Sequence, residues 1–294
     1  MKLLLQDASK HRDQWLELRA GGITASEVPT VLGLNPYQSR FGLWQQKLKA
    51  RQGIFEDVDN EAMFWGRQLE EPIAQALQER HGMDLYAPDA LFAHDELPLL
   101  ATPDRLDRVS AVPVEIKTTS ERHREQWETG LADSAHCQLA TQMLVLDAPT
   151  GFAAALVGGQ RLFLHQIERD PILDQQIAQA VKDFWALVIN EEPPDLDASD
   201  LAEIKEAHPD VSDEIRELDA AQESLIVSLQ DAKAEIARLS KRKAQLEAEL
   251  LQWLGDAGKA RGTRWEVSRK RISKEAYQVK ANSYVEMRIK ELKP

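Results

Sequence analysis

A short apolar run near the middle of the chain places two charged residues where a strand faces the protein core. Residues 111–119 are rich in β-branched side chains and predict a strand, with Glu115 and Lys117 two positions apart within it. Because side chains alternate between the two faces of a strand, both charges share one face and Ile116 lies on the other. A core-facing Glu and Lys are unfavourable unless each has a partner. The fold must therefore supply partners for both.

A bound metal ion is one reason for such a pair. Pro103-Asp104 precedes Glu115, and strands predicted over 98–106 and 111–119 would form a meander that brings the two carboxylates together. Carboxylates bind Mg²⁺, and a nearby ammonium can orient or activate an attacking water. The alternative is a solvated strand edge, where Glu-x-Lys is common. The pattern Pro-Asp followed by Glu-x-Lys resembles the nuclease signature written PD-(D/E)XK.

A third acid falls on a helix predicted over residues 60–81, with Asn60 as its N-cap and Gly82 ending it. Glu70 lies on the apolar stripe of this helix, whereas Glu71 lies off the stripe and is expected to meet solvent. Glu70 is therefore a candidate metal ligand, or it compensates the helix dipole. The stripe consists of Met63, Gly66, Ile73 and Leu77.

The segment after a first short helix, residues 10–19, predicts an anion site. Thr24 and Glu27 fit a capping box, which places Ser26 in a first helical turn with free N–H groups. Arg19, separated by Gly21-Gly22, would supply a guanidinium to the same anion. The alternative is an ordinary helix cap beside a surface arginine.

Alternating strand and helix patterns cover the rest of the first two thirds of the chain. A helix over 134–146 carries Gln138 and Gln142 at i, i+4 spacing, and Asp170-Pro171 opens another helix that ends before Pro193-Pro194. The remaining predicted elements are a helix over 39–49, a strand over 85–93, and a hairpin of strands 151–157 and 161–168.

The pattern changes after about residue 195. No Gly or Pro occurs from Val211 to Leu254, so one helix of about 65 Å is expected there. Apolar residues recur in heptads, and the helix either packs on its own chain or forms an intermolecular coiled coil. The heptad series is Leu218, Leu225, Ala232, Leu239, Leu246 and Trp253, with Leu229, Ile236 and Leu250 four residues beyond three of its members.

Residues 256–294 form a basic segment in an acidic chain. Eleven Lys and Arg against five acids leave +6 here, whereas the whole chain carries −13. Trp265, Tyr277 and Tyr284 are interleaved with the basic residues, which suits phosphate contact and base stacking, or else the segment is a solvated tail. The predicted organisation is a first domain over 1–195, a linker and long helix over 196–255, and the basic segment over 256–294.

Composition excludes several classes of protein. With 294 residues, 43% hydrophobic and 29% charged, the chain is typical of a globular protein, and no apolar run approaches the roughly 20 residues of a membrane span. A single cysteine, Cys137, excludes internal disulfides and multi-cysteine metal sites and predicts a cytoplasmic location. The net charge argues against DNA binding by the surface at large, so that DNA contact requires a local basic patch or a metal.

Several of these motifs occur in an order that resembles the YqaJ-type viral recombinase family, which includes the phage lambda exonuclease. The resemblance covers about residues 10–190 and is most specific in Ile-Thr-Ala-Ser-Glu-Val. The matching segments are Trp15-Leu16-Glu17-Leu18-Arg19, Gly22-Ile23-Thr24-Ala25-Ser26-Glu27-Val28, Trp65-Gly66-Arg67-Gln68-Leu69-Glu70, Pro103-Asp104, Glu115-Ile116-Lys117 and Gln138.

The resemblance implies a restriction-endonuclease-like α/β core, with a mixed sheet flanked by helices, that uses Mg²⁺ or Mn²⁺. It implies that Glu70, Asp104, Glu115 and the Ile116 carbonyl bind metal, that Lys117 orients the water, and that Gln138 supports Lys117. Arg19 and Ser26 match residues that bind the 5′-phosphate of a DNA end. An aromatic often follows the helix Gln in the family, whereas Ala140, Thr141 and Gln142 stand here.

The leading hypothesis is a Mg²⁺-dependent 5′→3′ exonuclease on linear double-stranded DNA that serves phage-type recombination in a bacterial cell. Such enzymes work beside a single-strand-annealing protein, and the lambda type forms a ring-shaped trimer. The alternatives are a structure- or nick-specific endonuclease that uses the same residues, and a non-catalytic module that binds DNA ends.

Overall fold

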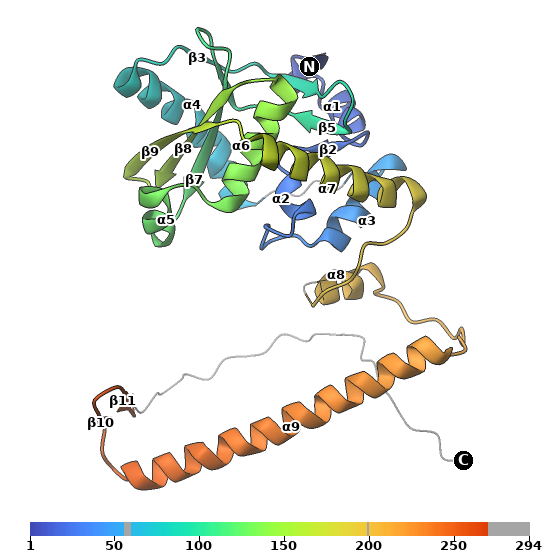
Figure 1. The fold of residues 1–294 in the computed structure, drawn as a ribbon, viewed down its shortest axis with the longest axis vertical. Coiled ribbons are helices and arrows are strands. Elements are labelled where there is room, and N and C mark those ends of the chain that lie inside the picture. The colour runs from blue at the N-terminus through green and yellow to red at the C-terminus, as the bar shows by residue number, and fades with distance from the viewer. Residues whose placement is uncertain (56–59, 199, 270–294) are drawn as a thin grey trace. The chain divides into compact units, whose positions relative to one another are not determined.

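The chain divides into two compact units, Met1–Ala207 and His208–Pro294 (Figure 1). This computed structural model describes residues 1–55, 60–198 and 200–269. Among these residues no helix combines the length and the hydrophobicity that a membrane crossing requires. The first unit continues past residue 195, where the first domain was expected to end, because α8 (Asp200–Ala207) packs on α3 (Arg40–Arg51). The Glu203 carboxylate accepts hydrogen bonds from the Ser39 hydroxyl and, at 3.2 Å, from the Ser39 backbone N–H.

Two mixed sheets form the first unit. The larger sheet has the order β3-β6-β7-β8-β9, in which β7 pairs parallel with β8 and the other neighbours are antiparallel. The smaller sheet has the order β1-β4-β5-β2, in which only β2 and β5 are parallel. The strands are β1 (Lys2–Gln6), β2 (Ile23–Thr24), β3 (Leu85–Tyr86), β4 (Ala90–Ala93), β5 (Leu99–Ala101), β6 (Arg105–Asp107), β7 (Pro113–Thr119), β8 (Thr150–Val157) and β9 (Arg161–Glu168).

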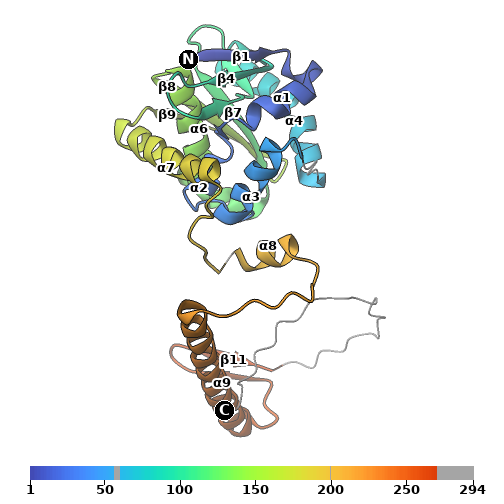
Figure 2. The ribbon, with the colours of Figure 1, turned by 90° about the vertical axis from the view of Figure 1, so that its right-hand side faces the viewer.

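Helices cover both faces of the larger sheet. Ile73 and Leu77 of α4 (Glu61–His81) pack with Val114 and Ile116 of β7, so α4 covers one face. Leu139 of α6 (Asp133–Leu146) packs with alanines of β8 on the other face. Figure 2 shows α4 and α7 (Pro171–Asn190) on opposite sides of the unit, with β7 between them. The shorter helices are α1 (Arg12–Arg19), α2 (Val28–Val31) and α5 (Arg124–Thr129).

Helix ends agree with the capping pattern, whereas two predicted strands are each broken in two. The Asn60 side chain accepts from Met63 N–H, Gly82 ends α4 at a φ of 67°, and Asp170 caps α7. The run 85–93 divides into β3 and β4, and 98–106 divides into β5 and β6, with the members of each pair in different sheets. The expected meander is therefore wrong in detail, and Asp104 lies in the short connection that leads from one sheet to the other.

The second unit contains α9 (Ala220–Leu254), followed by a hairpin of β10 (Lys259–Arg261) and β11 (Glu266–Ser268). The long helix was expected from Val211 but begins at Ala220, because the Asp219 carboxylate and the Gln222 side chain form a capping box there. Its 35 residues span about 53 Å rather than 65 Å. Most of the predicted basic segment, residues 270–294, lies outside the described residues.

Candidate active site

The two charges of β7 face α6, as the alternation of the strand predicted. Glu115 is 1% exposed, and amide groups of α6 hold both of its oxygens. Gln138 Nε2 donates to one oxygen at 2.7 Å, and Gln142 Nε2 donates to the other at 2.6 Å. The i, i+4 spacing of the two glutamines places both amides on the face of α6 that meets β7. The buried carboxylate is thus paired at each oxygen.

Lys117 completes this network. Its Nζ lies 2.6 Å from the Glu115 carboxylate and donates to Gln138 Oε1 at 2.8 Å. Burial lowers the pKa of the Lys117 ammonium, but the charges of Glu115 and Asp104 outweigh burial, and the net shift of this pKa is upward. Lys117 is therefore a fixed cation at neutral pH. It can donate hydrogen bonds and stabilise negative charge, but it has no lone pair to serve as a base.

Gln142 is a site residue that the sequence did not identify as one. It stands among the residues that depart from the family pattern, yet it is fully buried and binds Glu115. Among the described residues its Oε1 atom has no hydrogen-bond partner. A flipped amide would direct that oxygen at a carboxylate, so Glu115 determines which way the amide points. The i, i+4 spacing with Gln138 was the signal that could have revealed this role.

Asp104 approaches β7 from the connection between the two sheets. Its Oδ2 accepts the Ile116 backbone N–H at 2.8 Å, which places the carboxylate beside the residue between Glu115 and Lys117. Burial, followed by the charges of Glu115 and Glu70, raises the pKa of Asp104 well above its usual range, although Lys117 opposes the shift. The charges of Glu115 and Glu70 thus act on Asp104 beside β7, the central strand of the larger sheet, where added positive charge would relieve the repulsion.

Arg105 connects Glu70 to this group. The buried guanidinium binds the Glu70 carboxylate through Nη1 and the Glu71 carboxylate through Nη2 at 2.8 Å. The expectation that Glu71 meets solvent is confirmed, since its side chain is 62% exposed against 31% for Glu70, but Glu71 also binds Arg105, which was not predicted. Burial of Arg105 requires counter-charges, which two adjacent acids of α4 supply. Nothing in the sequence indicated this arginine beyond its position directly after Asp104.

In the described part of the chain, no three His, Cys, Asp or Glu side chains form a cluster that could hold a metal ion. Glu70 is turned to Arg105, and both oxygens of Glu115 are occupied by amide donors. The residue types nevertheless fit a hard cation, because carboxylate and backbone carbonyl oxygens are the ligands that Mg²⁺ prefers. Burial first, and then the negative charges of Glu115 and Glu70, raise the pKa of Asp104, and a bound cation would offset both effects. The metal ligands stay a prediction.

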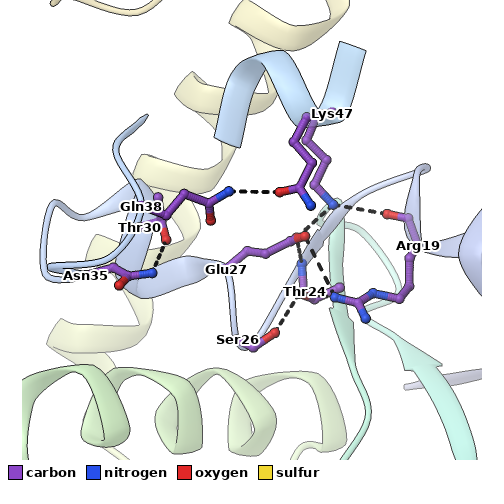
Figure 3. Close-up of polar contacts among 9 residues, drawn as sticks. Arg19, Thr24, Ser26, Glu27, Thr30, Asn35, Gln38 and Lys47 are labelled. Carbon is purple, nitrogen blue, oxygen red and sulfur yellow. Dashed lines mark hydrogen bonds and ion pairs between the residues drawn. The ribbon is translucent and has the colours of Figure 1, made fainter. Parts of the chain in front are cut away.

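A second polar cluster surrounds the turn before α2 (Figure 3). The expected helix cap at Thr24 is wrong, because residues 24–27 form a turn and α2 begins only at Val28. Half of the capping box is present, since Glu27 Oε2 accepts the Thr24 N–H at 2.8 Å, but Glu27 N–H donates to the Thr24 carbonyl instead of its hydroxyl. Ser26 therefore precedes the helix. Its hydroxyl lies 3.1 Å from the Thr24 hydroxyl.

Arg19 belongs to the same cluster. Its guanidinium stacks over Trp15 at 4.3 Å, and Nη2 donates to the Thr24 hydroxyl at 3.4 Å and lies 3.8 Å from Glu27. Lys47 of α3 is buried, with its Nζ 2.7 Å from the Glu27 carboxylate and 3.2 Å from the Arg19 carbonyl. Burial raises the pKa of Glu27, but Lys47 and Arg19 outweigh it and lower the pKa overall. One carboxylate between two cations leaves a net positive charge.

This cluster opens into a cavity of about 590 Å³ with a strongly basic wall. Its basic residues are Arg12, Arg19, Lys47, Lys49 and Arg67, and its apolar residues include Trp15, Phe55 and Met63. Arg67 is one turn before Glu70 on α4, so a single helix contributes both to the cavity and to the acidic group. Lys47 and its pairing with Glu27 were not predicted, because a lysine on an amphipathic helix normally reaches solvent.

Comparison with known proteins supports the same fold. Residues 14–153 match the family profile of the YqaJ-like viral recombinase domain. The chain is 28% identical over 264 residues to the uncharacterized protein YqaJ of Bacillus subtilis (strain 168). This alignment covers 87% of this chain and 82% of that protein.

This chain is also similar to two crystal structures of LHK-Exo, an alkaline exonuclease from Laribacter hongkongensis. One structure is of the protein itself, and the other is of its complex with dAMP. Each has a TM-score of 0.53 at 24% identity and covers 61% of this chain and 93% of that chain. The expected restriction-endonuclease-like core, a mixed sheet between helices, is thereby confirmed. Residues 14–153, which lie in the first unit, are therefore similar to the YqaJ-like viral recombinase domain.

Proposed function

We propose that the chain is a Mg²⁺-dependent exonuclease that digests linear double-stranded DNA from 5′ to 3′ during phage-type recombination. The observation that carries the proposal is that α4 contributes residues both to the basic cavity and to the acidic group. Arg67 lines the basic cavity next to Arg19, and Glu70, one turn later, belongs to the acidic group around Asp104. A terminal phosphate held in the cavity would place the adjoining DNA near the residues suited to hydrolysis. The alkaline exonuclease with the same fold supports this function.

Glu70, Asp104, Glu115 and the Ile116 carbonyl are the proposed metal ligands. When bound, Mg²⁺ supplies charge neutralisation at the scissile phosphate and lowers the pKa of the attacking water. Mn²⁺ binds the same kinds of oxygen ligand, and we expect it to substitute for Mg²⁺.

Lys117 is proposed to orient the water and to stabilise the charge that develops on the phosphate. Glu115 and Gln138 hold its ammonium from two sides, so its position is set before substrate arrives. Gln142 fixes the other oxygen of Glu115, which keeps that carboxylate from rotating away from Lys117.

One assay separates this proposal from its alternatives. Linear, nicked and covalently closed duplexes, labelled at either the 5′ or the 3′ end, are incubated with the protein in Mg²⁺ and in EDTA. We expect hydrolysis of linear DNA only, early release of the 5′ label, and no reaction in EDTA. Cleavage of closed or nicked circles would favour the endonuclease alternative. Binding of ends without hydrolysis would favour the non-catalytic module.

Arg19 is expected to confer preference for a phosphorylated 5′ end. Its planar guanidinium can contact two phosphate oxygens, and a hydrogen bond to a charged group is worth about 1.5–3 kcal/mol. Wild type should therefore cleave 5′-phosphate ends at least about tenfold faster than 5′-hydroxyl ends at low substrate concentration. Arg19→Ala should remove this preference. The measurement is kcat/KM on both duplexes.

A matched control for Arg19 is Arg108→Ala. Arg108 also stacks on an aromatic ring, lying 4.5 Å from Tyr86, but it does not line the basic cavity. It should retain the phosphate preference of wild type. An unchanged preference in Arg19→Ala would leave Arg19 as a structural residue and remove the support for end recognition in this cavity.

Glu70→Gln and Glu71→Gln form a second matched pair, since both acids bind Arg105 and each variant removes one of its counter-charges. Of these two acids, Glu70 but not Glu71 is among the charges that raise the pKa of Asp104, so only Glu70 is proposed to reach the metal. Glu70→Gln should therefore raise the Mg²⁺ concentration for half-maximal rate by roughly tenfold or more, and Glu71→Gln should change it little. Equal effects of the two changes would show that these acids act only through Arg105.

A further inference from the structure

The long helix of the second unit carries an apolar stripe that is largely solvent-exposed in the described chain. In heptad terms, one row of this stripe holds Leu225, Leu239 and Leu246, and the other holds Leu229, Ile236 and Leu250. Leu225 is 70% exposed, Ile236 is 64% exposed and Leu246 is 47% exposed. The rows run from Leu225 to Leu250, which is 26 residues or nearly four heptads, and this meets the roughly three to four heptads that a coiled coil needs. An exposed apolar stripe of this length is typical of a helix that packs against a partner helix with the same repeat.

We propose that α9 pairs antiparallel with α9 of a second copy of this chain. In this arrangement each residue of one row faces a residue of the other row. Ile236 faces Leu239 of the second copy, Leu229 faces Leu246, and Leu225 faces Leu250. Lys243, the charged member of the seam, faces Ala232, whose small side chain leaves room for the lysine stem to run out to solvent.

The ends of the helix agree with this alignment. α9 begins at Ala220 and ends at Leu254, and the layer of Ile236 and Leu239 lies at its midpoint. Two copies aligned on that layer overlap along their entire length. Any shift by a heptad would leave about a turn or two at each end without a partner and would remove apolar layers from the seam.

Charges beside the seam select the same alignment. Ile236 and Lys243 belong to the same row of the seam. Glu235 directly precedes Ile236 and Arg242 directly precedes Lys243, so both charged side chains flank the interface. The proposed register places Glu235 opposite Arg242 of the second copy, and this pair occurs twice. A shift of one heptad places Glu235 opposite Glu235 in one direction, or opposite Glu249 in the other. Like charges disfavour both shifts.

A parallel pair is less favourable. In a parallel, in-register dimer each seam residue meets its own counterpart, so Lys243 of one copy would lie against Lys243 of the other. Arg242 would attract Glu247 of the second copy, but this attraction would offset the repulsion between the lysines only in part. Both side chains lie at the solvent-exposed border of the interface, where ion pairs are weak. Antiparallel pairing avoids the contact between lysines and keeps an attractive pair at the rim.

The pairing has a consequence for the assembly. Each chain enters α9 at Ala220, so antiparallel helices place the two starting points at opposite ends of a rod about 53 Å long. The first units of the two chains are then attached at opposite ends of the helix pair. A dimer of this kind would carry one site for a DNA end on each of the two chains. This consequence for DNA rests on the proposed function, whereas the pairing of the helices does not.

Disulfide capture in the full-length protein tests the arrangement. Ala232→Cys and Lys243→Cys proteins, distinguished by mass, are oxidised separately and as a mixture. We expect an interchain disulfide in the mixture that links one chain of each kind, and little within either protein alone. The native Cys137 is buried, with its pKa raised to about 12, so it should stay reduced. Efficient capture in Lys243→Cys alone would overturn the proposal in favour of a parallel pair. No capture in the mixture would show that α9 does not pair with a second copy.

Charge exchange provides a second readout in the same cysteine proteins. Glu235→Arg should slow capture about tenfold, because the introduced arginine would then face Arg242 of the second copy, and Arg242→Glu should act likewise. The two changes together in each chain restore opposite charges and should restore the rate. A double variant as slow as either single variant would contradict the antiparallel register.

Discussion

Replacement of Lys117 by alanine is expected to reduce DNA hydrolysis by at least 10²–10³-fold. Alanine removes the ammonium that lies 2.6 Å from Glu115 and 2.8 Å from Gln138 Oε1, and with it the proposed donor to the water and the phosphate. The fold should survive, because Gln138 and Gln142 still bind both oxygens of Glu115. Single-turnover rates on a linear duplex in saturating Mg²⁺ give the effect, and thermal unfolding and duplex affinity show whether the protein is otherwise intact.

Lys182→Ala serves as the control, since Lys182 is an exposed lysine of α7 remote in sequence from the site. It should leave the rate, the affinity and the melting temperature near the wild-type values. A Lys117→Ala protein that retains hydrolysis within about threefold of wild type would contradict the assignment of Lys117 to the reaction.

Asp104→Asn is expected to abolish most hydrolysis and yet stabilise the metal-free protein. The loss of a ligand carboxylate should cost at least the roughly 10–100-fold that partners of metal ligands typically contribute. Stability should rise because asparagine can still accept the Ile116 N–H but carries no charge beside Glu115 and Glu70. A gain of about 1 kcal/mol would raise Tm by about 2–4 °C in a domain of this size.

The gain in stability should depend on pH in a defined direction. The pKa of Asp104 is higher in the folded than in the unfolded chain, so its ionisation destabilises the fold as pH rises through the folded value. Asp104→Asn should therefore stabilise most at neutral and alkaline pH. The gain should vanish in acid, below the ordinary pKa of an aspartate, where wild type is protonated in both states. Thermal unfolding in EDTA across this range provides the measurement.

Asp107→Asn is a matched control with the opposite sign. Burial raises the pKa of Asp107, but hydrogen bonds from Ser110, Asp84 and Val109 outweigh it, and the net shift of this pKa is downward. Asp107 thus stabilises the fold above the ordinary aspartate pKa, and that contribution is lost as pH falls through its folded value. Its replacement should lower Tm at neutral pH. A stabilising Asp107→Asn, or a destabilising Asp104→Asn, would show that charge repulsion does not govern this group.

The local sequence pattern was sufficient to predict features that depend only on residues close together along the chain. The period-2 alternation of 111–119 placed Glu115 and Lys117 on one face, and α6 covers that face. Asn60, Gly82 and the Asp170-Pro171 step predicted helix ends that the structure confirms, because a cap is formed by residues within a turn of the end. The same local rule failed at Thr24, since pairing of β2 with β5 holds Ile23 and Thr24 in a strand.

Only the tertiary structure decided which partner each buried charge receives. Arg105 meets Glu70 across 35 positions of sequence, and Lys47 meets Glu27 across 20. Such pairs depend on the order of strands in two sheets and on the helices that cover them, neither of which leaves a periodic trace in the sequence. Gln142 lies between these cases. The sequence determined that it shares a face of α6 with Gln138, and only the parallel register of β7 and β8 beneath that helix decided that the face would meet a buried carboxylate.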